Sequence, residues 1–120
     1  MMIPKILADI KEATGLNVYS EKSTHKADCI VYSLIKRYDD GAVAQWQLTI
    51  KILTNSTKTA LETQDIIDNL LVVKGDEKKY PEIYECAQDG GGDVWDPELQ
   101  LYQHIVYYTF ITKSKVDWRI

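Results

Sequence analysis

The feature that most constrains this chain is a pair of β-rich runs, residues 29–37 and 43–53, on either side of the turn sequence Asp39-Asp40-Gly41. A glycine there supplies the positive φ that a tight hairpin turn requires. In the second run, apolar side chains alternate with polar ones, as in a strand with one buried face and one polar face. The buried set comprises Ala44, Trp46, Leu48, Ile50 and Ile52. The sequence therefore predicts an antiparallel hairpin with one buried face.

Two helical patterns can cover that face. Residues 4–14 carry apolar side chains at helical spacing, and Gly15 is well placed to end the helix with a positive φ. A second pattern of about four turns follows the cap-forming residues 55–57, although Thr59 with Glu62 offers a later capping box. We expect this second helix to pack on the apolar face of the hairpin. Its stripe comprises Ala60, Thr63, Ile67, Leu70 and Leu71, and Trp46, Leu48, Ile50 and Ile52 are predicted to lie beneath it.

Three further extended segments complete the pattern, at residues 16–19, 83–87 and 101–112. The last is semi-apolar on both faces, which is typical of a central strand or of a strand with one face against a partner. Between the last two, residues 89–98 are acidic and rich in glycine, and they are predicted to form a long hairpin connection. The order of elements indicates one α+β domain, residues 1–120, with a largely antiparallel sheet of four to five strands and two helices packed on one face.

Charge excludes some classes of function. The chain has 120 residues, with 14 Lys and Arg against 18 Asp and Glu, so the net charge is −4. Such a surface does not attract a phosphate backbone, and tight nonspecific DNA binding is not expected. No apolar run approaches the 18 to 20 residues of a membrane span, and the start lacks the apolar core of a signal peptide, which predicts a protein kept inside a cell. Cys29 and Cys86 are then expected to be reduced and to behave as small hydrophobes, with a disulfide disfavoured.

The residues that could carry chemistry do not form a recognisable set. His25 and His104 are the two imidazoles, and neither has a Ser or Cys nearby in a nucleophile pattern. Cys86, Asp89 and His104 could meet at a strand end, but the local spacing of a zinc site is absent. The charged run at residues 76–79 is interpreted as a solvated loop rather than a nuclease-like set. We therefore expect no enzyme activity, no catalytic residue, no metal and no cofactor.

The segment 89–98 has two interpretations. Its four carboxylates could hold a calcium ion, but they lack the alternating spacing of an EF-hand loop, so a hydrated tip is favoured. The three glycines at 90–92 lack the context of a phosphate loop, which indicates mobility rather than nucleotide binding. Eight tyrosines and three tryptophans against one phenylalanine favour half-buried interface surface and so an assembly subunit.

The layout of nearly the whole chain resembles the tail-terminator, tail-completion and head-to-tail joining proteins of long-tailed bacteriophages and prophages. The resemblance begins with an opening helix that ends in Thr14-Gly15-Leu16-Asn17-Val18-Tyr19. An apolar strand at Cys29-Ile30-Val31-Tyr32 follows and forms a hairpin with residues 46–52. A capped helix starting at Ala60-Leu61-Glu62 and a long last strand complete the resemblance. The chain departs from the pattern in two places. It has Ala27-Asp28 where many members carry a proline, and it continues past the last strand with residues 116–120.

This resemblance implies a structural virion subunit that forms a ring, typically a hexamer, at the head-proximal end of the tail. The ring would end polymerisation of the tail tube and join tail to head. Its partners would be other copies of itself, the tail-tube protein and the head connector, while DNA would pass through without tight binding. The protein would occupy the host cytoplasm before assembly and the virion tail afterwards. An alternative class is a small host-directed binding or inhibitor module, which would be equally acidic and equally free of motifs.

For a ring subunit, we expect contacts or channel lining from two hairpin loops and from the last strand. The loop residues are Asp39, Asp40, Gly41, Asp89, Gly90, Gly91, Gly92, Asp93, Asp96 and Glu98. The interface residues expected on the strand are Tyr102, His104, Tyr107 and Tyr108.

Overall fold

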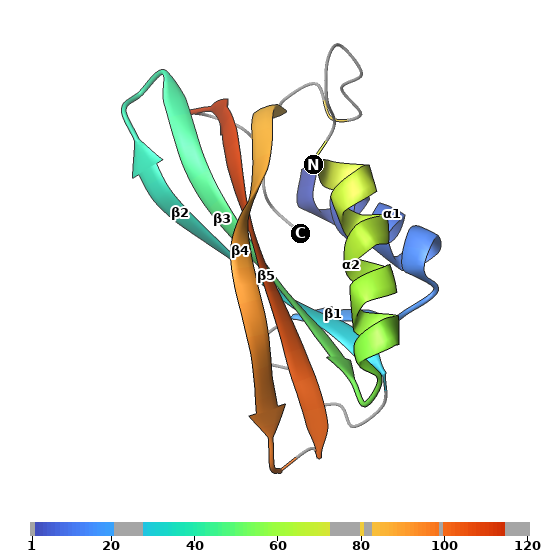
Figure 1. Ribbon diagram of the computed structural model, residues 1–120. Coiled ribbons are helices and arrows are strands. Elements are labelled where there is room, and N and C mark those ends of the chain that lie inside the picture. The colour runs from blue at the N-terminus through green and yellow to red at the C-terminus, as the bar shows by residue number, and fades with distance from the viewer. Residues whose placement is uncertain (1, 21–27, 73–79, 81–82, 99, 115–120) are drawn as a thin grey trace.

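The computed structural model describes residues 2–20, 28–72, 80, 83–98 and 100–114 as two helices and five strands (Figure 1). In chain order the elements are α1 (Met2–Thr14), β1 (Val18–Ser20), β2 (Cys29–Asp39), β3 (Val43–Thr54), α2 (Thr57–Leu71), β4 (Ile83–Asp96) and β5 (Leu101–Lys113). The predicted order of helix, strands, helix and strands is confirmed.

The five strands form one sheet with the order β1-β2-β3-β5-β4. The pairs β2–β3, β3–β5 and β5–β4 are antiparallel, and only the short β1 runs parallel to its neighbour β2. The fold is therefore α+β with a largely antiparallel sheet, as predicted. β5 is an interior strand between β3 and β4, which agrees with its apolar character on both faces.

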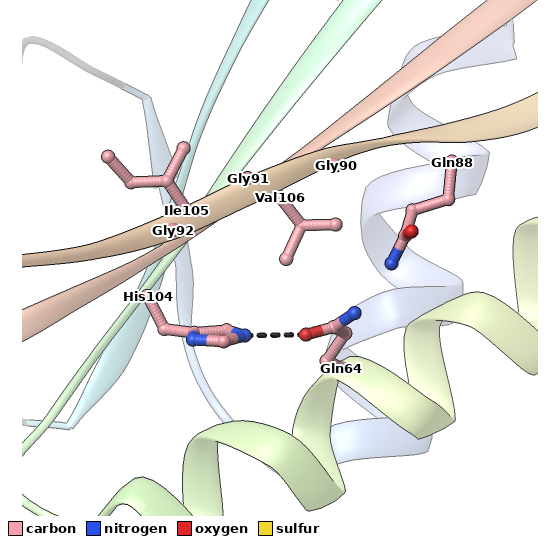
Figure 2. Close-up of a pocket in the computed structure, with 8 residues that line it drawn as sticks. All are labelled: Gln64, Gln88, Gly90, Gly91, Gly92, His104, Ile105 and Val106. Carbon is pink, nitrogen blue, oxygen red and sulfur yellow. Dashed lines mark hydrogen bonds between the residues drawn. The ribbon is translucent and has the colours of Figure 1, made fainter.

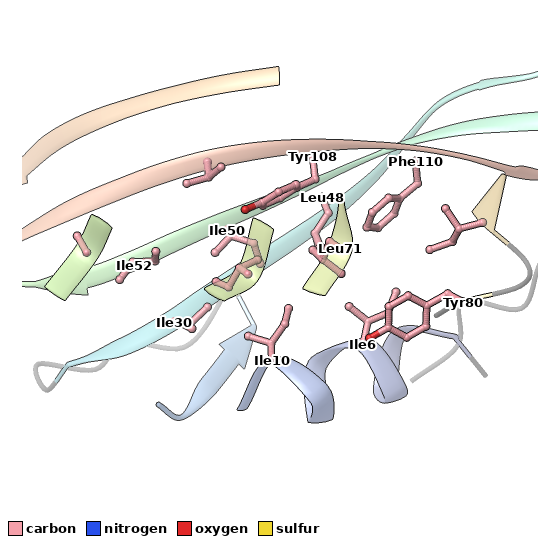
Figure 3. Close-up of a cluster of buried hydrophobic side chains, with 14 residues drawn as sticks. Ile6, Ile10, Ile30, Leu48, Ile50, Ile52, Leu71, Tyr80, Tyr108 and Phe110 are labelled. Carbon is pink, nitrogen blue, oxygen red and sulfur yellow. The ribbon is translucent and has the colours of Figure 1, made fainter. Parts of the chain in front are cut away.

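Both helices lie on the same side of the sheet, and the main core fills the space between the two layers (Figures 1 and 3). Ile50 of β3 and Ile67 of α2 are completely buried in this core, and Trp46 and Leu70 pack at its margin. The predicted packing of the β3 stripe under α2 is thus confirmed. The other completely buried side chains of the core are Ile6, Ile10, Ile30, Leu48, Ile52, Tyr108 and Phe110.

Local capping explains where the helices begin and end. The Ser56 side chain accepts a 3.2 Å hydrogen bond from the Thr59 backbone N–H, so Ser56 caps α2, and Thr59 lies inside the helix. α1 ends at Thr14, and Gly15 follows with φ 73° and donates its N–H to the Lys11 carbonyl at 2.9 Å. This is the left-handed helix end that the sequence predicts.

A smaller apolar cluster lies on the opposite face of the sheet. Its buried members are Cys29, Val31, Leu53 and Leu101, with Tyr19 packed against them. Cys29 is a buried free thiol there, and Cys86 is a half-buried free thiol on the helix side. Burial raises the pKa of the Cys29 thiol, and the nearby Asp28 adds to the effect. Both cysteines thus behave as the small hydrophobes that the sequence predicts.

The acidic connection predicted at residues 89–98 is wrong in extent. β4 continues to Asp96, and the three glycines at 90–92 lie within it and not at a hairpin tip. The strand bulges between Gln88 and Gly91, where the register to β5 shifts. A Cβ on Gly91 would lie 1.8 Å from the Ile105 carbonyl oxygen, so the close approach to β5 requires a glycine. Glycine is a poor strand former by propensity, and pairing with the long β5 overrides it here.

Several residues of interest lie outside the described part of the chain. They are His25, the charged run at 76–79 and the segment 116–120 with Trp118. Within the residues that are described, neither helix is long and apolar enough to cross a membrane.

Candidate functional site

His104 ties the helix layer to the sheet beside the β4 bulge. Its Nδ1 lies 2.5 Å from Oδ1 of Asp93, the residue directly opposite on β4. Its Nε2 lies 2.5 Å from Oε1 of Gln64 on α2, as Figure 2 shows. The side chain is buried, with 8% of the residue exposed. Because both ring nitrogens are already engaged by neighbours in the same chain, His104 is not free to activate a nucleophile or to bind a metal.

A hollow of about 230 Å³ lies next to this histidine. It forms where the glycines of the bulge contribute no side chain between β4, β5 and α2 (Figure 2). Its lining comprises Gln64, Gln88, Gly90, Gly91, Gly92, His104, Ile105 and Val106. The lining includes amides and one engaged imidazole but no hydroxyl, thiol or carboxylate, so it presents no nucleophile and no acid–base pair.

Tyr108 and Asp68 form a second connection between the two layers. The buried Tyr108 phenol donates a 2.5 Å hydrogen bond to Oδ1 of Asp68, and Gln88 Nε2 lies 3.5 Å from the other oxygen of that carboxylate. Burial raises the pKa of Tyr108, and the bond to Asp68 adds to the effect. The phenol therefore stays neutral and acts as a donor to the helix.

Cys86 is not poised as a nucleophile. Its thiol lies on the helix side of β4, and burial together with the carboxylates of Asp89, Asp68 and Glu85 raises its pKa to about 12. Because the thiolate is the reactive form, a thiol with this pKa is inert at neutral pH.

The metal site considered at Cys86, Asp89 and His104 does not form. Cys86 lies opposite Phe110 on the ladder, and His104 lies opposite Asp93. Asp89 accepts a hydrogen bond from Thr109 instead. Across the described ranges, no group of three or more His, Cys, Asp and Glu side chains is close enough to hold a metal ion.

The carboxylates of the segment 89–98 are mostly engaged within their own hairpin. Asp93 contacts His104, and Asp96 accepts hydrogen bonds from Gln103 Nε2 at 2.8 Å and from the Glu98 backbone N–H at 3.0 Å. Asp89, which contacts Thr109, and Asp93 and Asp96 are therefore hydrogen-bonded residues of β4. The sequence predicted a flexible acidic loop here instead.

The four residues predicted as an interface on β5 divide between the two faces of the sheet. His104 and Tyr108 point under α2 and are 8% and 0% exposed, so α2 of the same chain, and not open surface, covers these two side chains. Tyr107 is half-buried on the opposite face. Tyr102 is 46% exposed and makes an edge-to-face contact with Trp95, with ring centroids 4.9 Å apart.

The turn between β2 and β3 is tightly hydrogen-bonded. Asp39 Oδ1 accepts from the Gly41 N–H at 2.9 Å and from the Ser114 hydroxyl at 2.6 Å. These bonds and Lys36 lower the pKa of Asp39 to about 2. Asp40 Oδ1 accepts from the Ala42 and Val43 N–H groups at 2.8 Å, which also lowers the pKa of that carboxyl. The predicted glycine turn is present, and its aspartates hold it in shape.

Several exposed apolar side chains lie towards the two hairpin turns, and others, Leu61, Ile66 and Tyr84, lie on α2 and β4. The two turns lie at opposite ends of the sheet because Ala44 pairs with Thr112 and Thr54 with Tyr102. Towards the β2–β3 turn the exposed apolar side chains are Ile35 and Tyr38, and towards the β4–β5 turn they are Val94, Trp95 and Tyr102. Exposed aromatic and aliphatic side chains of this kind are typical of contact surfaces. The tyrosine and tryptophan content predicts half-buried interface surface, but it does not indicate that exposed apolar side chains lie towards both ends of the sheet.

Comparison with solved structures identifies chains of the same fold. The fold is similar to that of a chain in the virion of a native gene transfer agent particle, with a TM-score of 0.62 and 13% sequence identity, over 92% of this chain and 91% of the other. The sequence matches no protein-family model. It also matches no curated protein.

Proposed function

We propose that this protein is a structural subunit of a phage-like virion that forms a ring at the head-proximal end of the tail. The ring ends polymerisation of the tail tube and joins the tail to the head connector. The observation that carries this proposal is the shared fold with a virion chain of a gene transfer agent, which extends over nearly the full length of both chains. The layout of the sequence independently resembles the tail-terminator family, whose members typically form hexamers.

The chemistry of the interior supports a structural role. His104 and Tyr108 are engaged with α2, Cys86 is held as a neutral thiol, and the hollow beside them offers no reactive side chain. These polar groups connect the helices to the sheet. A subunit that must keep its shape under assembly forces needs such connections.

Charge supports passage of DNA without adhesion. The net charge is −4, and β4 contains four carboxylates and no lysine or arginine. In a ring around a DNA passage, such a strand repels phosphates and does not retain the duplex. The subunit is then made in the host cytoplasm and resides in the virion tail after assembly.

The proposal is tested by measuring assembly. Native mass spectrometry and sedimentation velocity over a range of concentrations give the mass, and negative-stain electron microscopy shows whether the particles are rings. Mixing with the tail-tube protein of the same phage or prophage then shows whether the rings seat on tube ends and stop growth. A strict monomer that neither binds tubes nor limits their length would overturn the proposal and favour a host-directed binding module.

A further inference from the structure

Two stretches of strand edge are open among the described residues. β1 covers β2 only at Ile30, Val31 and Tyr32, although β2 continues to Asp39. On the other side of the sheet, β4 is the last strand over its whole length (Figure 1). Among the described residues, the open stretches are therefore residues 33–39 of β2 and residues 85–95 of β4. Open edges present unpaired N–H and C=O groups and are natural templates for another chain.

These two edges carry opposite charge. β4 contains Glu85, Asp89, Asp93 and Asp96 and no cation, whereas the open stretch of β2 contains Lys36 and Arg37. Lys36 and the Asp39 carboxylate at the end of β2 lie 3.1 Å apart and offset each other, so Arg37 gives this stretch its net positive charge. Each edge also exposes a large apolar side chain, with Ile35 of β2 51% exposed and Tyr84 of β4 43% exposed.

The charge pattern selects one kind of contact between copies. Two β4 edges brought together would oppose acid to acid, and two β2 edges would oppose base to base, so symmetric dimers through either edge are disfavoured. A β2 edge against a β4 edge joins opposite charges. This contact uses different surfaces on the two copies and is therefore head-to-tail, the kind that builds a ring when the rotation closes.

Strand direction fits the same contact. Three successive antiparallel pairings separate β2 from β4, so the two edge strands run in opposite directions. Around a rotation axis, the β4 of one copy therefore meets the β2 of the next in antiparallel orientation. Antiparallel pairing would continue from subunit to subunit.

We propose that residues 33–39 of β2 in one copy pair with β4 of the next copy, and that this contact closes the ring. The inference rests on the proposed function and names the surfaces that serve it. The ladder also identifies a charge pair. One row of paired residues crosses the sheet from β2 to β4 through Tyr38, Gln45, Ile111 and Glu85. If neighbouring copies sit at the same height along the ring axis, Tyr38 of one copy is therefore next to Glu85 of the other. Arg37 lies in the bulge just before Tyr38 and then faces that Glu85.

Charge reversal tests this pairing. Arg37 and Glu85 lie on the exposed parts of their strands, and Arg37 contacts Gln47 within its own chain. R37E and E85K should each leave the circular dichroism spectrum unchanged and raise the assembly dissociation constant about tenfold or more, because each places like charges together. Matched controls are K58E and E62K, which reverse exposed charges on α2 away from both edges and should leave assembly unchanged.

Mixing the two single variants gives the sharpest result. An R37E copy carries acidic side chains at both position 37 and position 85. An E85K copy carries basic side chains at both of these positions. Each variant therefore complements the other at both of its edges. A one-to-one mixture should assemble where neither variant does alone, with native masses corresponding to equal numbers of each variant. Assembly should also slow amide exchange in residues 33–39 and 85–89 of the wild type.

The outcomes separate this inference from the function on which it rests. A wild-type chain that never assembles overturns the proposed function and the edge pairing together. A wild-type ring that tolerates both reversals, or variants that stay apart when mixed, overturns the edge pairing and leaves the ring function standing.

Discussion

The Tyr108 hydroxyl donates a 2.5 Å hydrogen bond to Oδ1 of Asp68 and so joins the centre of β5 to helix α2. Tyr108 is completely buried, and its ring packs among the aliphatic side chains of β3 and α2 (Figure 3). Tyr108→Phe keeps this packing and removes only the donor, which leaves the Asp68 carboxylate without its buried partner. We expect the free energy of unfolding to fall by about 1–3 kcal/mol in urea denaturation. Tyr107→Phe, one residue away on the other face, is the matched control, and equal effects of the two changes would contradict this role.

The same phenol makes stability sensitive to alkali. Burial and the bond to Asp68 raise the pKa of Tyr108 above its ordinary value of 10.0. The neutral form is therefore favoured by folding, so stability is complete below pH 10 and is lost as the pH rises above it. The wild type should lose stability above pH 10, between about pH 10 and pH 12, more steeply than Tyr108→Phe. Parallel pH profiles for the two proteins would show that the phenol is not responsible.

Gly91 at the end of the β4 bulge and the next residue, Gly92, differ in which substitutions they tolerate. A Cβ on Gly91 would lie 1.8 Å from the Ile105 carbonyl oxygen, whereas a Cβ on Gly92 meets nothing within 4 Å. Gly91→Ala should destabilise the fold by at least about 2 kcal/mol, because the backbone of β5 must move. Gly92→Ala should change stability by less than about 1 kcal/mol. Thermal unfolding gives the melting temperatures of both variants for comparison with the wild type. A well-folded Gly91→Ala protein with an unchanged melting temperature would rule out the close approach of Gly91 to β5.

The core beneath α2 predicts a large truncation effect at Ile50. This side chain of β3 is 0% exposed and packs in the core between the sheet and α2. Ile50→Ala should cost about 2–5 kcal/mol, from lost burial and from the cavity that remains. Leu61→Ala, at a position 50% exposed on α2, should stay within about 0.5 kcal/mol of the wild type. Similar denaturation midpoints for Ile50→Ala and the wild type would refute the placement.

The β2–β3 turn gives an acid dependence of stability. The Ser114 hydroxyl, the Gly41 N–H and Lys36 lower the pKa of Asp39 from 3.8 to about 2. The ionised carboxylate therefore stabilises the folded state above about pH 4, and this contribution is lost as the pH falls from 4 towards 2. Asp39→Asn should be less stable than the wild type at pH 6, with the difference shrinking towards pH 2. Ser114→Ala should weaken the same dependence, and a difference that does not change with pH would contradict it.

Much of the fold was predictable because its periodic patterns are strong. The alternation from Ala44 to Ile52 and the helical stripe through Ile67 each indicate one buried face, and the structure packs these faces together. Gly90 to Gly92 were misassigned because glycine carries no side-chain pattern, and their place in β4 depends on pairing with β5. The two faces of β5 are both semi-apolar, so alternation alone could not show that His104 and Tyr108 lie beneath α2.

The polar contacts beneath α2 were beyond sequence reasoning for a different reason. Gln64 lies 40 residues from His104, and Asp68 lies 40 residues from Tyr108. No local spacing connects such pairs, and they come together only through the path of the chain across the sheet. The clearest sequence signal was the position of Gln64 and Asp68 on α2, four residues apart and so on one side of the helix.

The pairing of β3 with β5, here called the β3–β5 seam, also has a consequence for folding kinetics. Thr54 and Tyr102 lie opposite each other on β3 and β5, yet they are separated by 48 positions in the chain. The β2–β3 and β4–β5 hairpins are local and form quickly, whereas joining them requires closure of a long loop that contains α2. The slow step should therefore be the docking of two preformed hairpins. Substitutions along the β3–β5 seam should slow refolding, while those at the outer edges should mainly speed unfolding.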